Sequence, residues 1–185
     1  FPFGGALSVE AYVRLGETTA SRTVFYFGDS AGSNALCLRE DDSPADGYGR
    51  LLFRNAGDGA DSAVASQNAH FFNSNTWTHV VATVSSSGAM QLFKDGALDS
   101  TINSGSTAPS TLTRAHHRIG AVVPSSGFFS GTIAYLRFWR EVALDEGQAS
   151  ELFSDHLKAA HEFDFRGCSD ANPVADAYNS SLEAT

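Results

Sequence analysis

The sequence predicts an all-β fold, a two-sheet antiparallel jelly-roll sandwich with one short surface helix, and three observations support this class. Residues 76–96 hold two runs of alternating apolar and polar residues, joined by a Ser-Ser-Ser-Gly turn and closed by Lys94-Asp95-Gly96, which is the pattern of an antiparallel hairpin. Similar short runs, bounded by turn residues, recur along most of the chain. Fourteen phenylalanines against a single methionine favour packed sheets over a helical bundle.

The first half of the chain contains five predicted strands. In residues 7–15 every second side chain is apolar, from Leu7 to Leu15, so this strand should be buried on one face only. The other four strands are predicted at residues 23–27, 35–39, 50–54 and, from a weaker pattern, 62–67. Two acidic, glycine-containing loops are predicted at residues 40–47 and 55–61.

The second half continues with the hairpin and two further strands. A loop rich in Ser, Thr and Gly is predicted at residues 100–109, and strands are predicted at 118–122 and 129–140. In the last strand one face should carry Ala134, Leu136 and Phe138, and the other face Tyr135, Arg137 and Trp139. If the alternation holds throughout, Val9, Val81 and Leu136 share one interior.

One helix is predicted, from Asp145 to Phe153, with room to extend toward His161. Asp145 can cap its N-terminus, and Gln148, three residues later, completes a capping box.

The composition narrows the function classes. The net charge is −9 and the pI is near 4.9, without a basic stripe, which argues against nucleic acid and against an anionic membrane surface as partners. No apolar run approaches the roughly 20 residues of a membrane-spanning helix, so membrane insertion is not expected. The chain starts at Phe1, inside what reads as a turn and strand, which suggests a fragment or a processed product.

The two cysteines, Cys37 and Cys168, form no CxxC pair, which argues against a zinc site. They could be joined in a disulfide, or either could be a buried apolar side chain or lack a partner that lies outside this chain.

Four segments, in the expected order, resemble the laminin G-like (concanavalin A-like lectin) family in its bacterial and algal repeat form. LSVEAYVRL resembles the family's early strand FTVEAWV, and NTWTHVVATVSSSGAMQLFKDGAL resembles its hairpin with a Trp at the start and a YVDG turn. HRIGA resembles the short strand that ends in Ile-Gly, and FSGTIAYLRFWREVALDEGQASELF resembles the closing strand and helix. The resemblance implies an extracellular module that binds or assembles.

The C-terminal segment HEFDFRGCSDANPVADAYNSSLEAT resembles the first strand of such modules. We therefore expect a sandwich over residues 1–160, followed at 161–185 by a strand and tail. This strand either opens the next repeat of a tandem array or returns to the same sheet, and in the array Cys168 would pair with a later cysteine. In both cases residues 162–165 should add to a sheet edge.

Sites of three kinds follow from the residues and the resemblance. Sugars stack on aromatic rings that lie on a polar face or in a loop, and the candidates are Tyr12, Tyr48, Tyr135 and Trp139, whereas Trp77 matches the family's core-facing Trp. The resemblance implies one structural Ca²⁺ held by loop carboxylates, with Asp29, Asp58 and Asp61 as candidates. Asn179 begins an N-glycosylation sequon.

Catalytic constellations have little support. Glu162 and Asp164 have the i, i+2 spacing of the carboxylate pair in retaining glycosidases. Some jelly rolls of this class carry such a pair within an E-x-D-x-x-E pattern, and the third carboxylate of that pattern is missing here. His79, inside the hairpin, is predicted to be a hydrogen-bonded packing residue, and the side chains of His116 and His117 should point to opposite faces.

The sequence thus predicts a secreted, non-catalytic module that binds a glycan or an extracellular protein. The alternative is a structural subunit of a filament or matrix, joined to copies of itself or to neighbouring repeats by strand exchange. A glycoside hydrolase of the same fold is a distant third.

Overall fold

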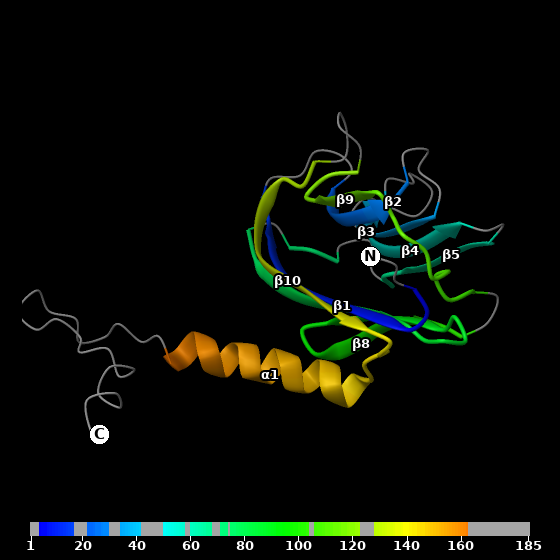
Figure 1. Cartoon of the computed structure of the whole chain (residues 1–185). Coiled ribbons are helices and arrows are strands. Elements are labelled where there is room, and N and C mark those ends of the chain that lie inside the picture. The colour runs from blue at the N-terminus through cyan, green and yellow to red at the C-terminus, as the bar shows by residue number, and fades with distance from the viewer. Residues whose placement is uncertain are drawn as a thin grey trace, which may run out of the picture. The chain divides into compact units, whose positions relative to one another are not determined.

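The computed structural model describes residues 4–16, 22–29, 34–41, 50–57, 60–67, 71–73, 75–103, 106–122 and 128–162. These residues form two five-stranded antiparallel sheets (Figure 1). Sheet I has the strand order β10 (Gly131–Arg140), β1 (Leu7–Leu15), β6 (Trp77–Val84), β7 (Met90–Lys94) and β8 (Ala97–Ile102). Sheet II has the order β5 (Ala60–Ala65), β4 (Arg50–Gly57), β3 (Ala35–Asp41), β2 (Thr23–Gly28) and β9 (His116–Ile119). The predicted sandwich fold is confirmed.

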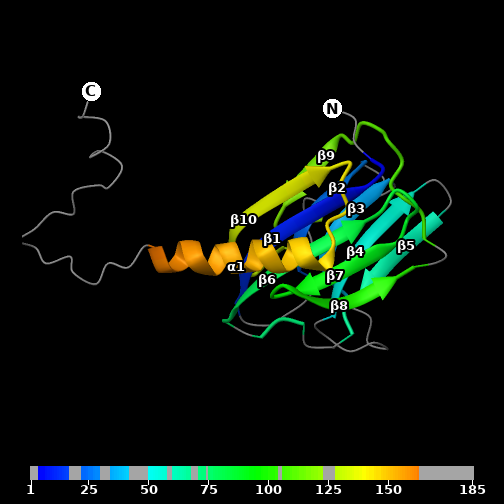
Figure 2. The ribbon, with the colours of Figure 1, turned by 90° about the horizontal axis from the view of Figure 1, so that it is seen from below.

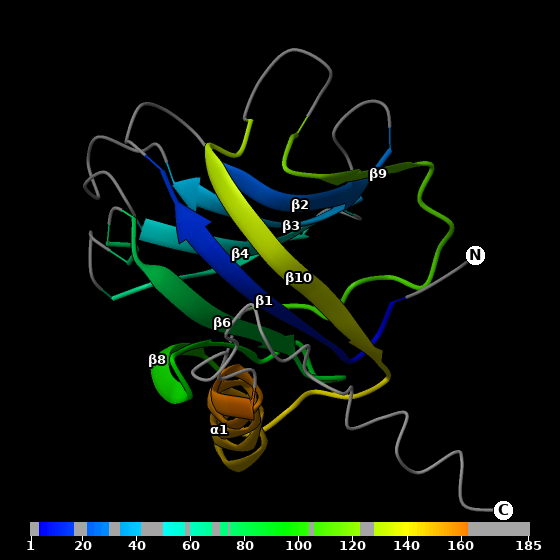
Figure 3. The same cartoon turned by 90° about the vertical axis from the view of Figure 1, so that its left-hand side faces the viewer.

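The main core lies between the two sheets, which Figure 3 shows as two layers. The alternation predicted for β1 is present, because Leu7, Val9, Ala11, Val13 and Leu15 are all buried in this core. Phe25 of sheet II packs edge-on against Phe138 of sheet I, with ring centroids 5.3 Å apart, and so joins the layers.

The hairpin is formed as predicted. Val81 pairs with Phe93 across β6 and β7, and Asp95 and Gly96 turn the chain into β8 with φ of 49° and 81°. Two positive φ angles in succession define the tight hairpin turn that Asp-Gly favours. The strand β8 was not predicted, since Ser100, Thr101 and Ile102 belong to it and not to a loop. Serine and threonine at an exposed edge strand look like loop residues in sequence.

Other boundaries also shift. Strand β9 covers 116–119 instead of 118–122. Residues 55–57 and 60–61 continue β4 and β5, so the second acidic loop is shorter than predicted and Asp61 lies in a strand, paired with Ala56.

Two predictions of side-chain direction are wrong. Tyr12 pairs with Tyr135, but Val13 pairs with Ile133, so β10 has a bulge at Ala134. The extra residue reverses the alternation, and Ile133 packs on the core while Ala134 is exposed. Val81 faces away from the main core, and its neighbours Val80 and Ala82 face the core instead, with Ala82 opposite Val9. Strand β6 is covered on both faces, so its continuous apolar run does not indicate which alternate residues face the main core.

The helix α1 (Glu146–Glu162) begins where predicted, and its first turns lie outside sheet I (Figure 2). The capping box is present: the Gln148 backbone N–H donates to Asp145 Oδ1 (2.9 Å), and the Asp145 N–H donates to Gln148 Oε1 (3.0 Å). Leu144 and Ala149 pack with Val81 and Phe93 on the outer face of the sheet.

The chain divides into two compact units, residues 1–153 and 154–185. Glu162 ends the helix, so its prediction as a strand residue is wrong, while residues 163–165 lie outside the described residues. Among the described residues, no helix is long and apolar enough to cross a lipid bilayer.

Candidate binding face on the first sheet

The polar side chains that alternate with the buried residues of β1 lie on the outer face of sheet I. Because β1 lies between β10 and β6, each outward residue has two cross-strand neighbours. Glu10 lies between Arg137 and Val81, Tyr12 lies between Tyr135 and His79, and Arg14 is opposite Trp77.

Glu10 and His79 form a fully buried pair at the base of this face, and both are 0% exposed. The Glu10 carboxylate accepts hydrogen bonds at Oε1 from His79 Nε2 and from the Tyr135 hydroxyl, both at 2.9 Å. Arg137 lies 3.4 Å from Oε2. A buried carboxylate is tolerated only when such donors replace water, so three strands are tied together through one side chain.

The electrostatics follow from this geometry. Burial alone would raise the pKa of Glu10, but the hydrogen bonds from His79 and Tyr135 and the charge of Arg137 outweigh it and hold the pKa below its usual value of 4.5. Burial, reinforced by the adjacent Glu10 carboxylate, raises the pKa of Tyr135 strongly. The carboxylate is therefore ionised and the phenol is a neutral donor at neutral pH.

Three aromatic rings stack beside this pair. The Tyr12 ring is 4.7 Å from the Trp77 ring, at an interplanar angle of 11°, and 5.9 Å from the Tyr135 ring, at 24°. The Arg14 guanidinium lies 5.3 Å from the centre of the Trp77 ring, and the Arg137 guanidinium lies 4.5 Å from that of Tyr135. We call these five residues the aromatic–guanidinium face.

This face presents ring edges and guanidinium groups to solvent. Tyr12 has Trp77 on its β6 side and Tyr135 on its β10 side, so neither face of its ring is open for a sugar to stack on. All three rings are half-buried, Arg14 is exposed, and the Arg137 side chain is 56% exposed. Such a surface can hydrogen-bond a polar chain that lies across the strands while its apolar parts contact the ring edges.

The structure brings together some of the predicted ligand-binding residues and separates others. Tyr12 and Tyr135 are in direct contact, as parts of one surface. Trp139 instead packs on the cluster of Val81, Phe93 and Ala149 beside the helix. Tyr48 lies outside the described residues.

Sequence reasoning missed three members of the face. Trp77 was expected to face the core, but it pairs with the outward residue Arg14. Arg14 and Arg137 were visible as polar residues of alternating strands next to Tyr12 and Tyr135. Their grouping depends on the order β10-β1-β6, which the local sequence does not encode.

Most of the residues predicted to bind a metal or to carry a glycan lie outside the described residues. Asp29 Oδ2 accepts a hydrogen bond from Asn34 Nδ2 at 3.2 Å. Asp58, Asn179 and the side chain of Asp61 lie outside the described residues. Within the part of the chain that is described, no group of three or more His, Cys, Asp or Glu residues could hold a metal ion.

Two further residues have defined surroundings. His79 is the hydrogen-bonded packing residue that was predicted. Cys37 is a buried thiol that packs with Tyr26, Ala35 and Ala56, which fits the interpretation as a small apolar side chain. Cys168 lies outside the described residues.

A laminin G family model, described as the concanavalin A-like lectin/glucanases superfamily, matches residues 1–148. The chain belongs to this superfamily, as the sequence resemblance indicated. No curated protein matches the chain.

Solved structures share the fold at low sequence identity. A candidate carbohydrate-binding protein from Bacteroides ovatus is 19% identical, with a TM-score of 0.61 over 82% of this chain and 41% of its own. Domains LG4-5 of the mouse laminin α1 chain are 18% identical, with a TM-score of 0.57 over 80% of this chain and 38% of theirs. The Ruminococcus gnavus IT-sialidase module CBM40, bound to α2,3-sialyllactose, is 10% identical, with a TM-score of 0.62 over 80% of this chain and 83% of its own. This chain therefore spans about two fifths of the first two proteins.

Proposed function

We propose that this chain is a non-catalytic binding module of an extracellular protein, and that it holds a carbohydrate on the aromatic–guanidinium face. The observation that carries the proposal is the stack of Tyr135, Tyr12 and Trp77, half-buried and flanked by two guanidinium groups. The ring edges can contact the apolar C–H patches of a sugar, and the guanidinium groups can hydrogen-bond its hydroxyls. The sialyllactose and carbohydrate-binding relatives of the same fold support this choice of ligand class.

A binding role agrees with the state of the acidic groups on this face. Glu10 is the carboxylate of the network, and it is fully buried and held by donors on two other strands. A general acid or nucleophile must reach its substrate, and Glu10 does not. Its role here is to fix the positions of Tyr135 and Arg137.

The test is a glycan array probed with the intact chain and with Arg14→Gln. Arg14 is exposed, and among the described contacts its guanidinium touches only the Trp77 ring, so its replacement should leave the fold intact. A hydrogen bond to a charged group contributes about 1.5–3 kcal/mol when buried and less in water, so we expect affinity to fall about fivefold or more. Arg140→Gln, the same charge change on the same sheet, is the matched control and should bind normally.

The array also tests whether binding depends on the structural Ca²⁺ that we propose. Asp29 is the one predicted candidate whose side chain is described, and Ca²⁺ takes 6–8 oxygen ligands, which include backbone carbonyls and waters as well as carboxylates. Signals lost in EDTA and restored by Ca²⁺ would support an ion-dependent site. An array that is silent with and without Ca²⁺ would contradict carbohydrate binding altogether.

A second candidate, assembly of copies through a sheet edge, is favoured by exposed apolar residues beside β9. Ile119 ends this edge strand and is 62% exposed, and Phe128 is 61% exposed. The Phe129 N–H donates to the Gly120 carbonyl at 2.8 Å. Phe128 and Ile119, the residues that precede this bonded pair, therefore lie at the same end of β9. Sedimentation velocity tests this role: concentration-dependent association that Ile119→Thr weakens would support it, and a monomer at all concentrations would exclude it.

A further inference from the structure

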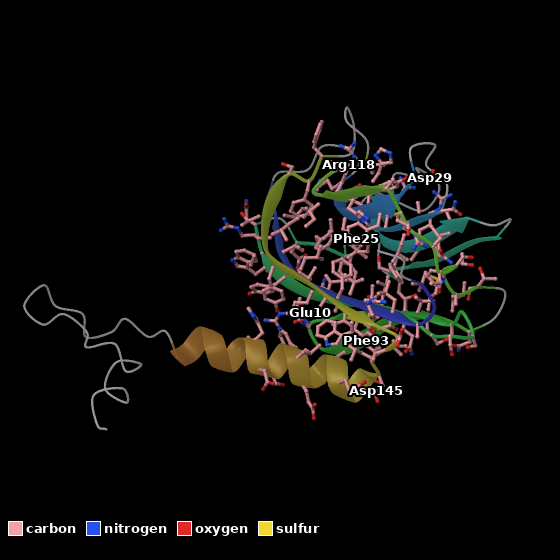
Figure 4. All side chains as sticks on the ribbon, in the orientation of Figure 1. Glu10, Phe25, Asp29, Phe93, Arg118 and Asp145 are labelled. Atoms are coloured by element: carbon pink, nitrogen blue, oxygen red, sulfur yellow. The ribbon has the colours of Figure 1, made fainter. Side chains whose placement is uncertain are left out.

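The buried pair of Glu10 and His79 is covered from the side of helix α1. The centre of the Phe153 ring lies 5.6 Å from the centre of the His79 ring, at an interplanar angle of 39°. Both members of the pair are 0% exposed, although they lie on the outer face of sheet I, where a polar side chain without cover would meet water. Figure 4 shows Glu10 on the side of the sheet that faces α1, and Phe25 in the main core on the other side. A helix residue therefore helps to keep water from this pair.

The turn before β8 positions Phe153 and the His79 backbone together. A Cβ added at Gly96 would lie 3.1 Å from the Phe153 Cβ, so the helix lies directly against the bare backbone of this turn. The preceding residue, Asp95, is bonded to the His79 backbone in both directions. The His79 N–H donates to Asp95 Oδ1, and the Asp95 N–H donates to the His79 carbonyl, both at 2.9 Å. The imidazole of His79 thus starts from a fixed backbone and contacts the Phe153 ring.

A continuous chain of contacts leads from the helix to the aromatic–guanidinium face. His79, which touches Phe153, places its Nε2 2.9 Å from Glu10 Oε1. The same oxygen accepts the Tyr135 hydroxyl at 2.9 Å, and Arg137 lies 3.4 Å from Oε2. Water that reached this carboxylate would compete for the same hydrogen bonds, so the hold of Glu10 on two members of the face depends on its cover.

We propose that the docked helix α1, through Phe153, holds the aromatic–guanidinium face in its ligand-binding arrangement, so that helix docking and ligand binding are coupled. The inference rests on the proposed carbohydrate site and assigns its regulation. Undocking of the first turns of α1 admits water to Glu10 and releases Tyr135 and Arg137. By thermodynamic linkage, a ligand on the face stabilises the docked helix in return. Phe153 is a positioning residue, because it acts on the face through His79 and Glu10.

Phe153→Ala compared with Leu152→Ala tests the coupling. Both residues are half-buried on α1, but Leu152 packs on the cluster around Val81, whereas Phe153 contacts His79. Both truncations remove packing between helix and sheet, so both should lower the midpoint of urea denaturation. On the glycan array, probed at several protein concentrations, Phe153→Ala should weaken binding about fivefold or more. Leu152→Ala should change it by less than about twofold, and Phe153→Leu, which restores an apolar cover, should recover most of the affinity.

Two further measurements separate this inference from the proposed function. NMR signals of the Tyr135 ring and the Arg137 guanidinium report the face without any ligand, and they should shift in Phe153→Ala but not in Leu152→Ala. In the parent chain, a glycan bound from the array should slow hydrogen exchange in the first turns of α1.

Equal effects of the two alanine variants, on affinity or on the NMR signals, would show that Phe153 only adds stability and would overturn the coupling. Unchanged hydrogen exchange in α1 with a glycan bound would also overturn it. A silent array would contradict carbohydrate binding, and the NMR comparison would still decide whether the helix positions the face.

Discussion

At the residue scale, Glu10 shows how far local patterns reach. Alternation in β1 assigned Glu10 to the polar face, and it does point away from the main core. Its complete burial comes from neighbours on β6 and β10, His79, Tyr135 and Arg137. A carboxylate that reads as solvated in sequence is the anchor of a three-strand network in the structure.

Glu10→Gln tests this anchor. Replacing the carboxylate weakens charge-assisted bonds from His79, Tyr135 and Arg137, so we expect about 1–3 kcal/mol of lost stability at neutral pH in urea denaturation. Glu151→Gln, on an exposed helix position, is the control and should have little effect. Equal stability of both variants and the parent chain would rule out the anchoring role.

The same carboxylate predicts a pH dependence. The folded-state pKa of Glu10 lies below its usual value of 4.5, so its stabilisation is complete above that pH and is lost as the pH falls through the lowered folded value. Stability of the parent chain should therefore drop on acidification below about pH 4.5, and Glu10→Gln should lack this part of the drop. Urea midpoints of both proteins, measured between pH 3 and pH 7, test this assignment. The same pH dependence in the parent chain and in Glu10→Gln would show that Glu10 is not the group responsible.

At the element scale, strong local signals predicted the elements and weak ones did not. The Asp-Gly turn and the Asp145–Gln148 capping box are present because each is complete within a few residues. The bulge at Ala134 and the direction of Val81 were missed, because they depend on register with β1 and on burial beneath the helix. Strand β8 was missed because its residues are mostly exposed or half-buried and polar.

Gly96 tests how the turn and the helix fit together. Its φ is +81°, and an added Cβ would lie 3.1 Å from Phe153 Cβ and 3.2 Å from Ser150 Cα, both on α1. Gly96→Ala should cost about 1–3 kcal/mol of stability, from backbone strain and from displacement of the helix. Gly5→Ala is the matched control, because Gly5 has a similar φ of +71° and no atom within 4 Å of the added Cβ. Equal losses in the two variants would mean that the helix contact contributes nothing.

At the scale of the whole molecule, the two sheets share one core and turn two different surfaces outward. Ring edges with guanidiniums lie on sheet I, and arginines around a buried phenol lie on sheet II. Every described side chain of the three apolar clusters lies before residue 154. The described side chains that form the apolar clusters of the sandwich are therefore distinct in sequence from the C-terminal part of the chain.

A chain that ends at Glu162 tests this separation. Since all three clusters are retained, we expect a single cooperative unfolding transition within about 1 kcal/mol of the full chain, measured by urea denaturation. Loss of the cooperative transition would show that residues 163–185 complete the sandwich, as the prediction of a strand returning to the same sheet requires.

Local sequence was sufficient to predict the class of fold, most strands and the helix start, because alternation, turn chemistry and capping act over a few neighbouring residues. The resemblance of four short segments predicted the superfamily. The alternation also placed Tyr12 and Tyr135 on a polar face. The stacking of these rings with Trp77, and the shared surface of Arg39, Arg54 and Arg118, became evident from the folded chain alone. Strand order and register bring such residues together, and both are set by long-range burial that no local pattern encodes.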